Sequence, residues 1–332
     1  MKRLKKVLIY TVILILLVVA GGLAYVTLAL PDVGKPENIS VAITPERIAR
    51  GEYLANHVTV CVDCHSRRDW TKFAAPIIEG STGGGGELFD ASVGFPGSVR
   101  VPNITPYNLK NWTDGEIFRA ITCGVRKNGN AIFPLMPWPY YSKMCREDVY
   151  SIIAYVRSLK PIETSYPKSN LDFPLNILVH TMPAKASLGD LPSPTDTIKY
   201  GEYLTRSAAC MECHTREENG KQIAGMEFAG GHEFTVNGNI VRSANITPDK
   251  ATGIGTWTRE AFLQRFKGLS DPSKASLVSA DDFQTVMPWY KYSGMKESDL
   301  KSVYAYLRTV KPVNNAVVKF KASNMVAQAD HN

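Results

Sequence analysis

Two short cysteine motifs are the residues of this chain best suited to chemistry. The first, Cys-Val-Asp-Cys-His, runs from Cys61 to His65, and the second, Cys-Met-Glu-Cys-His, runs from Cys210 to His214. Two thiols separated by two residues and followed by histidine attach c-type haem, because the thiols form thioethers and the imidazole ligates the iron. A four-thiolate zinc site or a thioredoxin-like dithiol would use the same cysteine spacing, but neither requires the histidine. The motifs therefore predict two covalently bound haem c groups.

Methionines in register in the two halves are the candidates for the second axial iron ligand. Met136 and Met287 each begin a Met-Pro-Trp sequence, in which proline stiffens an extended loop that can hold a thioether over an iron. Met144 and Met295 stand just before expected helix starts, where an apolar residue packs on the fourth helical residue. We predict Met136 and Met287 as the ligands, with ordinary core packing as the competing interpretation. The predicted haem residues are the cysteines Cys61, Cys64, Cys210 and Cys213 and the axial pairs His65 with Met136 and His214 with Met287.

A duplication surrounds these motifs. Several other short sequences recur in the same order, namely Gly-Glu-Tyr-Leu at 51 and 201, Asn-Ile-Thr-Pro at 103 and 245, Trp-Thr at 112 and 257, and Ala-Tyr at 154 and 305. Two copies of a unit this long are two domains and not a solenoid. The chain is therefore expected to contain two tandem modules with one Cys-His motif each.

Both modules are predicted to be helical, so the expected fold class is all-α. Thr44-Pro45 and Ser193-Pro194 each combine a cap residue with proline and predict the first helix of each module. Apolar residues at helical spacing over 149–159 and 300–310 predict the last helices. The predicted organisation is a cytoplasmic N-terminus (1–6), an anchor (7–30), a linker (31–44), a first cytochrome c domain (45–161), a proline-rich linker (162–192), a second cytochrome c domain (193–312) and a tail (313–332).

Residues 7–30 form an uncharged apolar run behind a basic N-terminus. The run exceeds the ~20 residues that cross a bilayer core and the ~7 to 15 apolar residues of a cleaved signal. The small residues Ala20 and Ala24 keep a cleaved signal open as the alternative. The basic flank predicts a cytoplasmic N-terminus, and haem attachment in bacteria takes place outside the membrane. We therefore expect a single-pass protein of the bacterial inner membrane whose two modules face the periplasm.

The formal net charge of +7 does not indicate nucleic-acid binding. Four of the basic residues precede the apolar run, namely Lys2, Arg3, Lys5 and Lys6. This cluster belongs to membrane topology and leaves the remainder only mildly basic.

Two cysteines lie outside the haem motifs. Cys123 and Cys145 could form a disulfide in an oxidising compartment, worth ~3 kcal/mol, or could be two buried thiols. The sequence leaves both interpretations open.

The assembled motifs carry a family resemblance. The Cys-His motifs, the Asn-Ile-Thr-Pro-Asp-Lys stretch from Asn245 to Trp257, and Met-Pro-Trp before a final helix resemble class I c-type cytochromes. The similarity is greatest to the cytochrome c subunits of membrane-bound alcohol and gluconate dehydrogenases and to dihaem cytochromes, and it covers nearly all of 44–312. It implies that four residues lie near the haem propionates: Asn103, Trp112, Asn245 and Trp257. The chain departs from those subunits in having two modules instead of three, and the longer motif is interrupted in the first module.

The resemblance implies electron transfer without enzymatic activity. The expected partners are a donor dehydrogenase or respiratory reductase and an acceptor such as a terminal oxidase or another cytochrome. A dihaem enzyme of the peroxidase or thiosulfate dehydrogenase type is the alternative, and it would need an open or labile iron position. Two matching Met-Pro-Trp loops favour the electron carrier.

Overall fold

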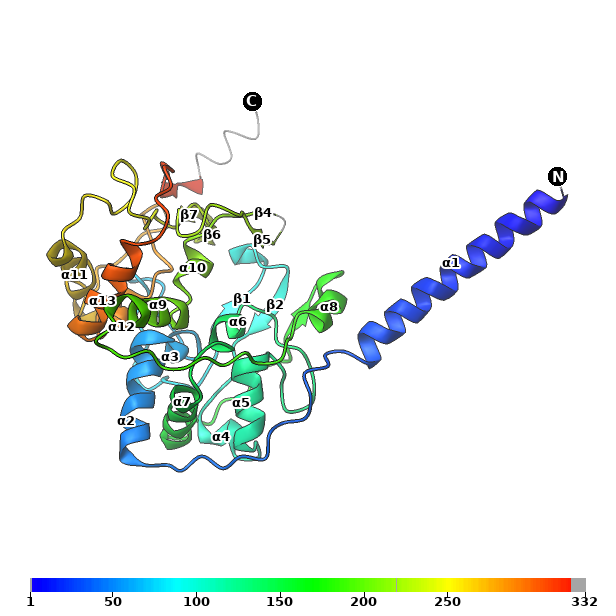
Figure 1. The fold of residues 1–332 in the computed structure, drawn as a ribbon, viewed down its shortest axis with the longest axis horizontal. Coiled ribbons are helices and arrows are strands. Elements are labelled where there is room, and N and C mark those ends of the chain that lie inside the picture. Colours follow the sequence, from blue (N-terminus) through cyan, green and yellow to red (C-terminus); the bar gives the residue numbers. More distant parts are fainter. Residues whose placement is uncertain (1, 219, 324–332) are drawn as a thin grey trace.

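The computed structural model describes residues 2–218 and 220–323. It begins with α1 (Lys2–Leu28), a helix of 27 residues that extends away from the rest of the chain (Figure 1). No residue of α1 is buried, and an 18-residue window of it has a mean hydropathy of 2.8, so the helix is long and apolar enough to cross a membrane, a test that secretion signals also pass. Residues 2–6, which were predicted to form a separate N-terminus together with Met1, form the first turns of this helix. Met1 lies outside the described residues.

The helices of the two modules follow one order. The helices of the first module are α2 (Pro45–Tyr53), the π-helical turn η1 (Leu54–Val58), α3 (Cys61–Cys64), α4 (Pro106–Leu109), α5 (Asp114–Cys123), α6 (Trp138–Tyr141) and α7 (Arg146–Ser158). Those of the second are α9 (Thr197–Ser207), α10 (Cys210–Cys213), α11 (Arg259–Lys267), α12 (Trp289–Tyr292) and α13 (Glu297–Leu307). The short helix α8 (Leu175–Leu178) lies between them, and 3-10 turns occur at η2 (Ala91–Val93), η3 (Val179–Thr181) and η4 (Pro272–Lys274).

One of the two predicted helix starts is confirmed. The Thr44 side chain accepts a hydrogen bond from the Arg47 N–H, and Pro45 is the first residue of α2. The prediction at Ser193-Pro194 is wrong, because α9 begins at Thr197. There the Asp196 carboxylate caps the helix, whereas the Ser193 hydroxyl bonds within the preceding turn.

Short antiparallel strands correct the all-α prediction. Each module adds a three-stranded sheet, made of β1 (Leu88–Phe89), β2 (Gly97–Arg100) and β3 (Asn170–Leu171) in the first, and of β6 (Glu233–Val236), β7 (Asn239–Arg242) and β8 (Phe320–Lys321) in the second. A further hairpin joins β4 (Glu217–Glu218) to β5 (Lys221–Gln222). The signal missed in the sequence is Asn237-Gly238, since both residues have positive φ and form the tight turn between β6 and β7.

The strands β3 and β8 show that each module continues beyond its last helix. Residues 162–171, predicted as linker, return to the sheet of the first module, where Leu171 pairs with Gly97 and the Tyr166 hydroxyl donates to the Gly85 carbonyl. Residues 313–321, predicted as tail, return in the same way to β7. The remainder of that tail, 324–332, lies outside the described residues.

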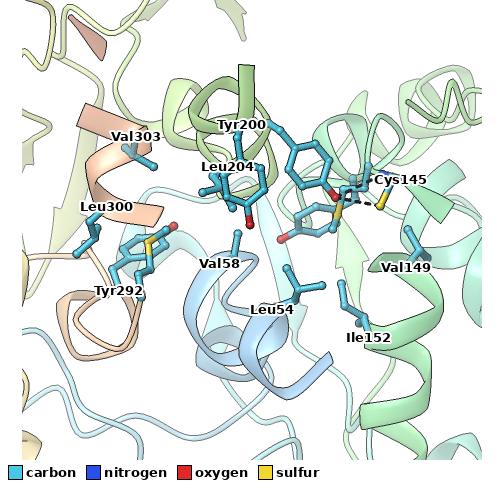
Figure 2. Packing of buried hydrophobic residues seen from close by; sticks show 14 of the residues in the cluster. Leu54, Val58, Cys145, Val149, Ile152, Tyr200, Leu204, Tyr292, Leu300 and Val303 are labelled. Atoms are coloured by element: carbon cyan, nitrogen blue, oxygen red, sulfur yellow. Dashed lines mark hydrogen bonds between the residues drawn. The ribbon is translucent and has the colours of Figure 1, made fainter. Parts of the chain in front are cut away.

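Glycine allows the first and last helix of each module to cross closely. A Cβ on Gly51 would lie 1.8 Å from the Ser151 carbonyl oxygen, and one on Gly201 would lie 1.9 Å from that of Ser302. This contact explains the repeated Gly-Glu-Tyr-Leu sequence in structural terms. Figure 2 shows the core around these crossings, in which residues of both modules lie in one cluster, among them Leu54, Val58, Leu204 and Leu300.

Candidate functional site

The two Cys-His motifs have the same backbone geometry. Each forms a single helical turn, entered through a residue in the left-handed region, Val60 with φ 44° or Ala209 with φ 50°. The His65 N–H donates to the Cys61 carbonyl at 2.9 Å, and the equivalent bond in the second motif is also 2.9 Å. The turn therefore holds both cysteines and the histidine in one fixed arrangement in each module. Within the described residues, no cluster of three His, Cys, Asp or Glu side chains forms a metal site of the zinc type.

The histidine rings are oriented as iron ligands require. The Nδ1 atom of His65 lies 2.8 Å from the Pro102 carbonyl oxygen, and that of His214 lies 2.7 Å from the Ala244 carbonyl oxygen. Because a carbonyl only accepts, Nδ1 must carry the proton, and Nε2 keeps its lone pair for a metal. Burial lowers the pKa of His65 to about 4 and also lowers the pKa of His214. Both rings are therefore neutral at neutral pH, and these residues fit a haem iron.

The two pairs of methionines occupy different surroundings. Met144 is 1% exposed just before α7, and Val149, the fourth residue of that helix, is fully buried in the same cluster. Met295 precedes α13 with the same burial pattern. Met136 and Met287 are only partly buried and lie on the loops that lead into α6 and α12. This division supports the predicted roles, while ligation by Met136 and Met287 stays a prediction.

The asparagines predicted near the propionates have a structural role. The Asn103 amide donates to the Ile162 carbonyl and the Thr164 hydroxyl, and its oxygen accepts from the backbone and hydroxyl of Thr105. The Asn245 amide donates to the Val313 carbonyl and to the Thr252 hydroxyl, which belongs to the nearby loop and not to the segment after the last helix, and its oxygen accepts from the backbone and hydroxyl of Thr247. These bonds use the donors and acceptors of both amides to fasten the return segments. The propionate contact therefore stays a prediction without support from the hydrogen bonds of these residues.

The two tryptophans differ in exposure. Trp112 is partly buried, and its carbonyl accepts from Arg157. Trp257 is 37% exposed and lines an open cleft of about 670 Å³ with Phe73, Arg265 and Leu269. Their contact with propionates also stays a prediction.

Cys123 and Cys145 form no disulfide in the part of the chain that the structure describes. Both are buried, and the Cys145 sulfur lies 3.5 Å from the Tyr203 hydroxyl of the second module (Figure 2). Cys145 therefore packs at the boundary between the modules.

A reciprocal pair of tyrosine–carboxylate bonds joins the modules. The Tyr53 hydroxyl donates to Asp299 at 2.6 Å, and the Tyr203 hydroxyl donates to Asp148 at 2.6 Å. Tyr53 and Tyr203 are equivalent residues of the repeat, and so are Asp148 and Asp299. Each module thus gives the other the same contact. The recurrence of these residues in register was visible in the sequence, but their contact between the modules was not predicted.

A second set of contacts brings the two Cys-His motifs toward the same boundary. The Tyr140 hydroxyl, just after Met-Pro-Trp in the first module, donates to Glu212 of the second motif at 2.8 Å. Burial raises the pKa of Tyr141 well above its usual value, and the nearby Cys61, Cys64 and Cys213 add to the rise. Because these thiols belong to both motifs, Tyr141 lies close to both candidate haem sites.

A buried ionic cluster distinguishes the first motif. Arg68 bonds Asp63 at 2.8 Å and Glu87 at 3.3 Å, and less than a tenth of each side chain is exposed. The Trp70 indole N–H donates to Glu87 at 2.6 Å, and Arg68 stacks over the Trp70 ring. In the second motif, Glu212 bonds only neutral partners among the described residues, Tyr140 and Gln222.

Comparison with known proteins agrees with this geometry. Residues 198–311 match the cytochrome c family model, so the second module is a cytochrome c domain, which implies covalently bound haem c. The chain is 24% identical over 314 residues to the cytochrome c subunit of a quinone alcohol dehydrogenase of Gluconacetobacter polyoxogenes, covering 88% of this chain and 63% of that protein. It is 25% identical over 281 residues to the cytochrome c subunit of gluconate 2-dehydrogenase of Pantoea cypripedii, covering 76% of this chain and 60% of the relative.

A third relative is matched over almost its whole length. The chain is 27% identical over 311 residues to a dihaem c-type cytochrome of Cereibacter sphaeroides, covering 89% of this chain and 95% of that protein. By contrast, it spans less than two thirds of the dehydrogenase subunits. The predicted resemblance to dihaem c-type cytochromes and dehydrogenase cytochrome c subunits is confirmed. That its relatives are such subunits supports electron transfer as the function.

Proposed function

We propose that this chain is a membrane-anchored dihaem cytochrome c that passes electrons from a dehydrogenase or respiratory reductase to an acceptor such as a terminal oxidase. The observation that carries the proposal is the duplicated Cys-His turn, in which each imidazole is held through Nδ1 and keeps Nε2 for a ligand. The apolar helix α1 behind its basic start supports an inner-membrane anchor with both modules in the periplasm.

The residues of the chain have separate roles in this function. Haem c, when bound, supplies an iron that gains and loses one electron without changing a substrate. The cysteines of both motifs would retain the group, and the carbonyls of Pro102 and Ala244 fix the histidine rings. Met136 and Met287 would supply the second protein ligand to each iron. Because the same ligand set is predicted for both modules, we favour an electron carrier over a peroxidase or thiosulfate dehydrogenase.

Haem content per chain tests the proposal. Full-length protein, denatured in alkaline pyridine, is expected to give two haem c per chain by absorbance. Replacing both Cys61 and Cys64 by alanine should leave one, and the same change at Cys210 and Cys213 should leave the other. A colourless parent protein would refute the proposal, and rapid turnover of peroxide or thiosulfate by the purified protein would favour the enzyme.

A further inference from the structure

The segment 172–182, between the modules, exposes apolar side chains outside the core. It contains α8 and η3 and has no charged residue after Asp172. Phe173 is 79% exposed and Leu178 is 45% exposed, whereas Val179 is buried and fastens the segment to the protein. Apolar side chains gathered on a surface indicate an interaction site.

The position of this segment next to α1 indicates which surface it binds. Both α8 and η3 contact α1, and Figure 1 shows α8 beside the end of α1 that joins the first module. If α1 crosses a bilayer, its end at Leu28 lies at the outer surface of that bilayer. The segment 172–182 then lies at the level of the lipid headgroups.

The charges around the segment suit a lipid surface. Lys168 and Lys185 are exposed on either side of it. Lysine side chains beside an apolar stretch reach toward lipid phosphates while the apolar residues enter the acyl boundary. Asp172, the one acidic residue of the segment, is exposed at its edge, where its backbone N–H donates to the Pro96 carbonyl.

We propose that residues 172–182 are a second membrane contact, with Phe173 and Leu178 inserted at the boundary between headgroups and acyl chains. This inference rests on the proposed role of α1 as an anchor. It also fixes the orientation of the first module, because the segment is tied to β2 through β3 and Pro96. Phe95, next to Pro96, packs edge-to-face on Phe133 at 5.5 Å, and Phe133 belongs to the loop that bears Met136. These contacts connect the segment with the loop that bears Met136.

Cysteine labelling of the full-length protein in lipid nanodiscs tests the contact. The variant Phe173→Cys is compared with Leu277→Cys, a position in the second module with a matched exposure of 78% against 79%. A charged, membrane-impermeant maleimide should react about tenfold more slowly with the first variant, because lipid covers it. Parent protein loaded with haem gives the background, since Cys123 and Cys145 are buried and the four motif cysteines would be held in thioethers.

A second matched pair covers the case in which Phe173→Cys does not fold. Leu178→Cys and Leu191→Cys are both 45% exposed, and only the first should be protected. Equal labelling rates within the folded pair, in protein that stays with the nanodiscs, would overturn the second contact while leaving the anchor intact. Protein that does not remain with the nanodiscs would refute the anchor and this contact together.

Discussion

The two modules share a backbone arrangement but differ in the charges around their Cys-His motifs. In the first, Asp63 and Glu87 share the buried cation Arg68. In the second, the equivalent acid Glu212 receives hydrogen bonds from the neutral Tyr140 and Gln222, and burial raises its pKa. Lys291 also acts on Asp63, so the two carboxylates of the first site face two cations, whereas Glu212 bonds neutral partners. Uncompensated negative charge beside a redox centre favours the oxidised state, so the two proposed sites should differ in reduction potential.

A similar difference occurs at the helix junctions between the modules. Asp148 accepts from Tyr203 and also from Arg50, at 2.8 and 2.7 Å. Asp299 accepts from Tyr53 and from the Ser298 hydroxyl, and Tyr200 occupies the place of Arg50 in the second copy. The repeat therefore preserves the positions of these contacts. The carboxylate of the first module is bound by a cation, Arg50, whereas that of the second is bound by the neutral Ser298.

Loss of a methionine ligand should have the largest effect. Met136→Ala should change the ligation of the first haem and leave the second low-spin, and Met287→Ala should do the reverse. Ferric absorption and electron paramagnetic resonance spectra would measure this change. Met144→Ala is the control, because it should cost about 2–5 kcal/mol of stability with an unchanged spectrum. An unchanged ferric spectrum in Met136→Ala would remove that residue from the site.

Removing the buried cation should destabilise the first module. Arg68→Leu leaves Asp63 and Glu87 without their shared partner, and breaking such a buried pair costs about 3–5 kcal/mol. Urea unfolding followed by visible absorbance would measure the loss. Arg216→Leu, at an exposed position after the second motif, should change stability by less than about 0.5 kcal/mol. Equal losses in the two variants would contradict the difference between the modules.

Replacing the glycine at the helix crossing should destabilise the two modules by similar amounts. Gly51→Ala and Gly201→Ala each force a methyl group onto a carbonyl oxygen, so both should lose about 2 kcal/mol or more. Thermal unfolding would measure both variants, with the exposed neighbour Glu52→Ala as the control. Losses of stability near zero would mean that the helices can move apart with no loss of folding free energy.

Removing the two tyrosine hydroxyl groups should reduce stability by different amounts. Tyr53→Phe and Tyr203→Phe each remove a hydrogen bond to a buried carboxylate, worth about 1.5–3 kcal/mol. The loss should be greater for Tyr53, because Asp299 has no cation in the place of Arg50. Denaturant unfolding compares them, with Tyr155→Phe as a control whose hydroxyl bonds only Asn56 within its module among the described residues. A greater loss for Tyr203→Phe would reverse the proposed order.

Removing the negative charge of Glu212 at the second motif should have the smallest effect, a shift in reduction potential. Glu212→Gln removes a partly buried negative charge and should raise the potential of the second haem by on the order of 50 mV. Spectroelectrochemical titration would resolve the shift, and the exposed Glu218→Gln should leave both potentials in place. A lowered potential in Glu212→Gln would contradict the electrostatic interpretation.

Local patterns in the sequence predicted much of this structure. The Cys-His turns, the cap at Thr44 and the amphipathic final helices depend on residues within a few positions of one another. The contacts between the modules could not be predicted in this way, because Tyr53 and Asp299 are 246 positions apart. The return segments were missed for the same reason, since β3 and β8 are two-residue strands fixed by distant partners.

The reciprocal tyrosine bonds have the form of an isologous interface, in which each half presents the same surface to the other. In a homodimer, every substitution at such an interface would occur twice. Joining the halves in one polypeptide frees each position from its counterpart, so Arg50 and Tyr200, or Asp63 and Glu212, can diverge independently. Covalent linkage also makes their pairing independent of protein concentration. A symmetric scaffold can thereby surround the two proposed redox centres with unequal charges.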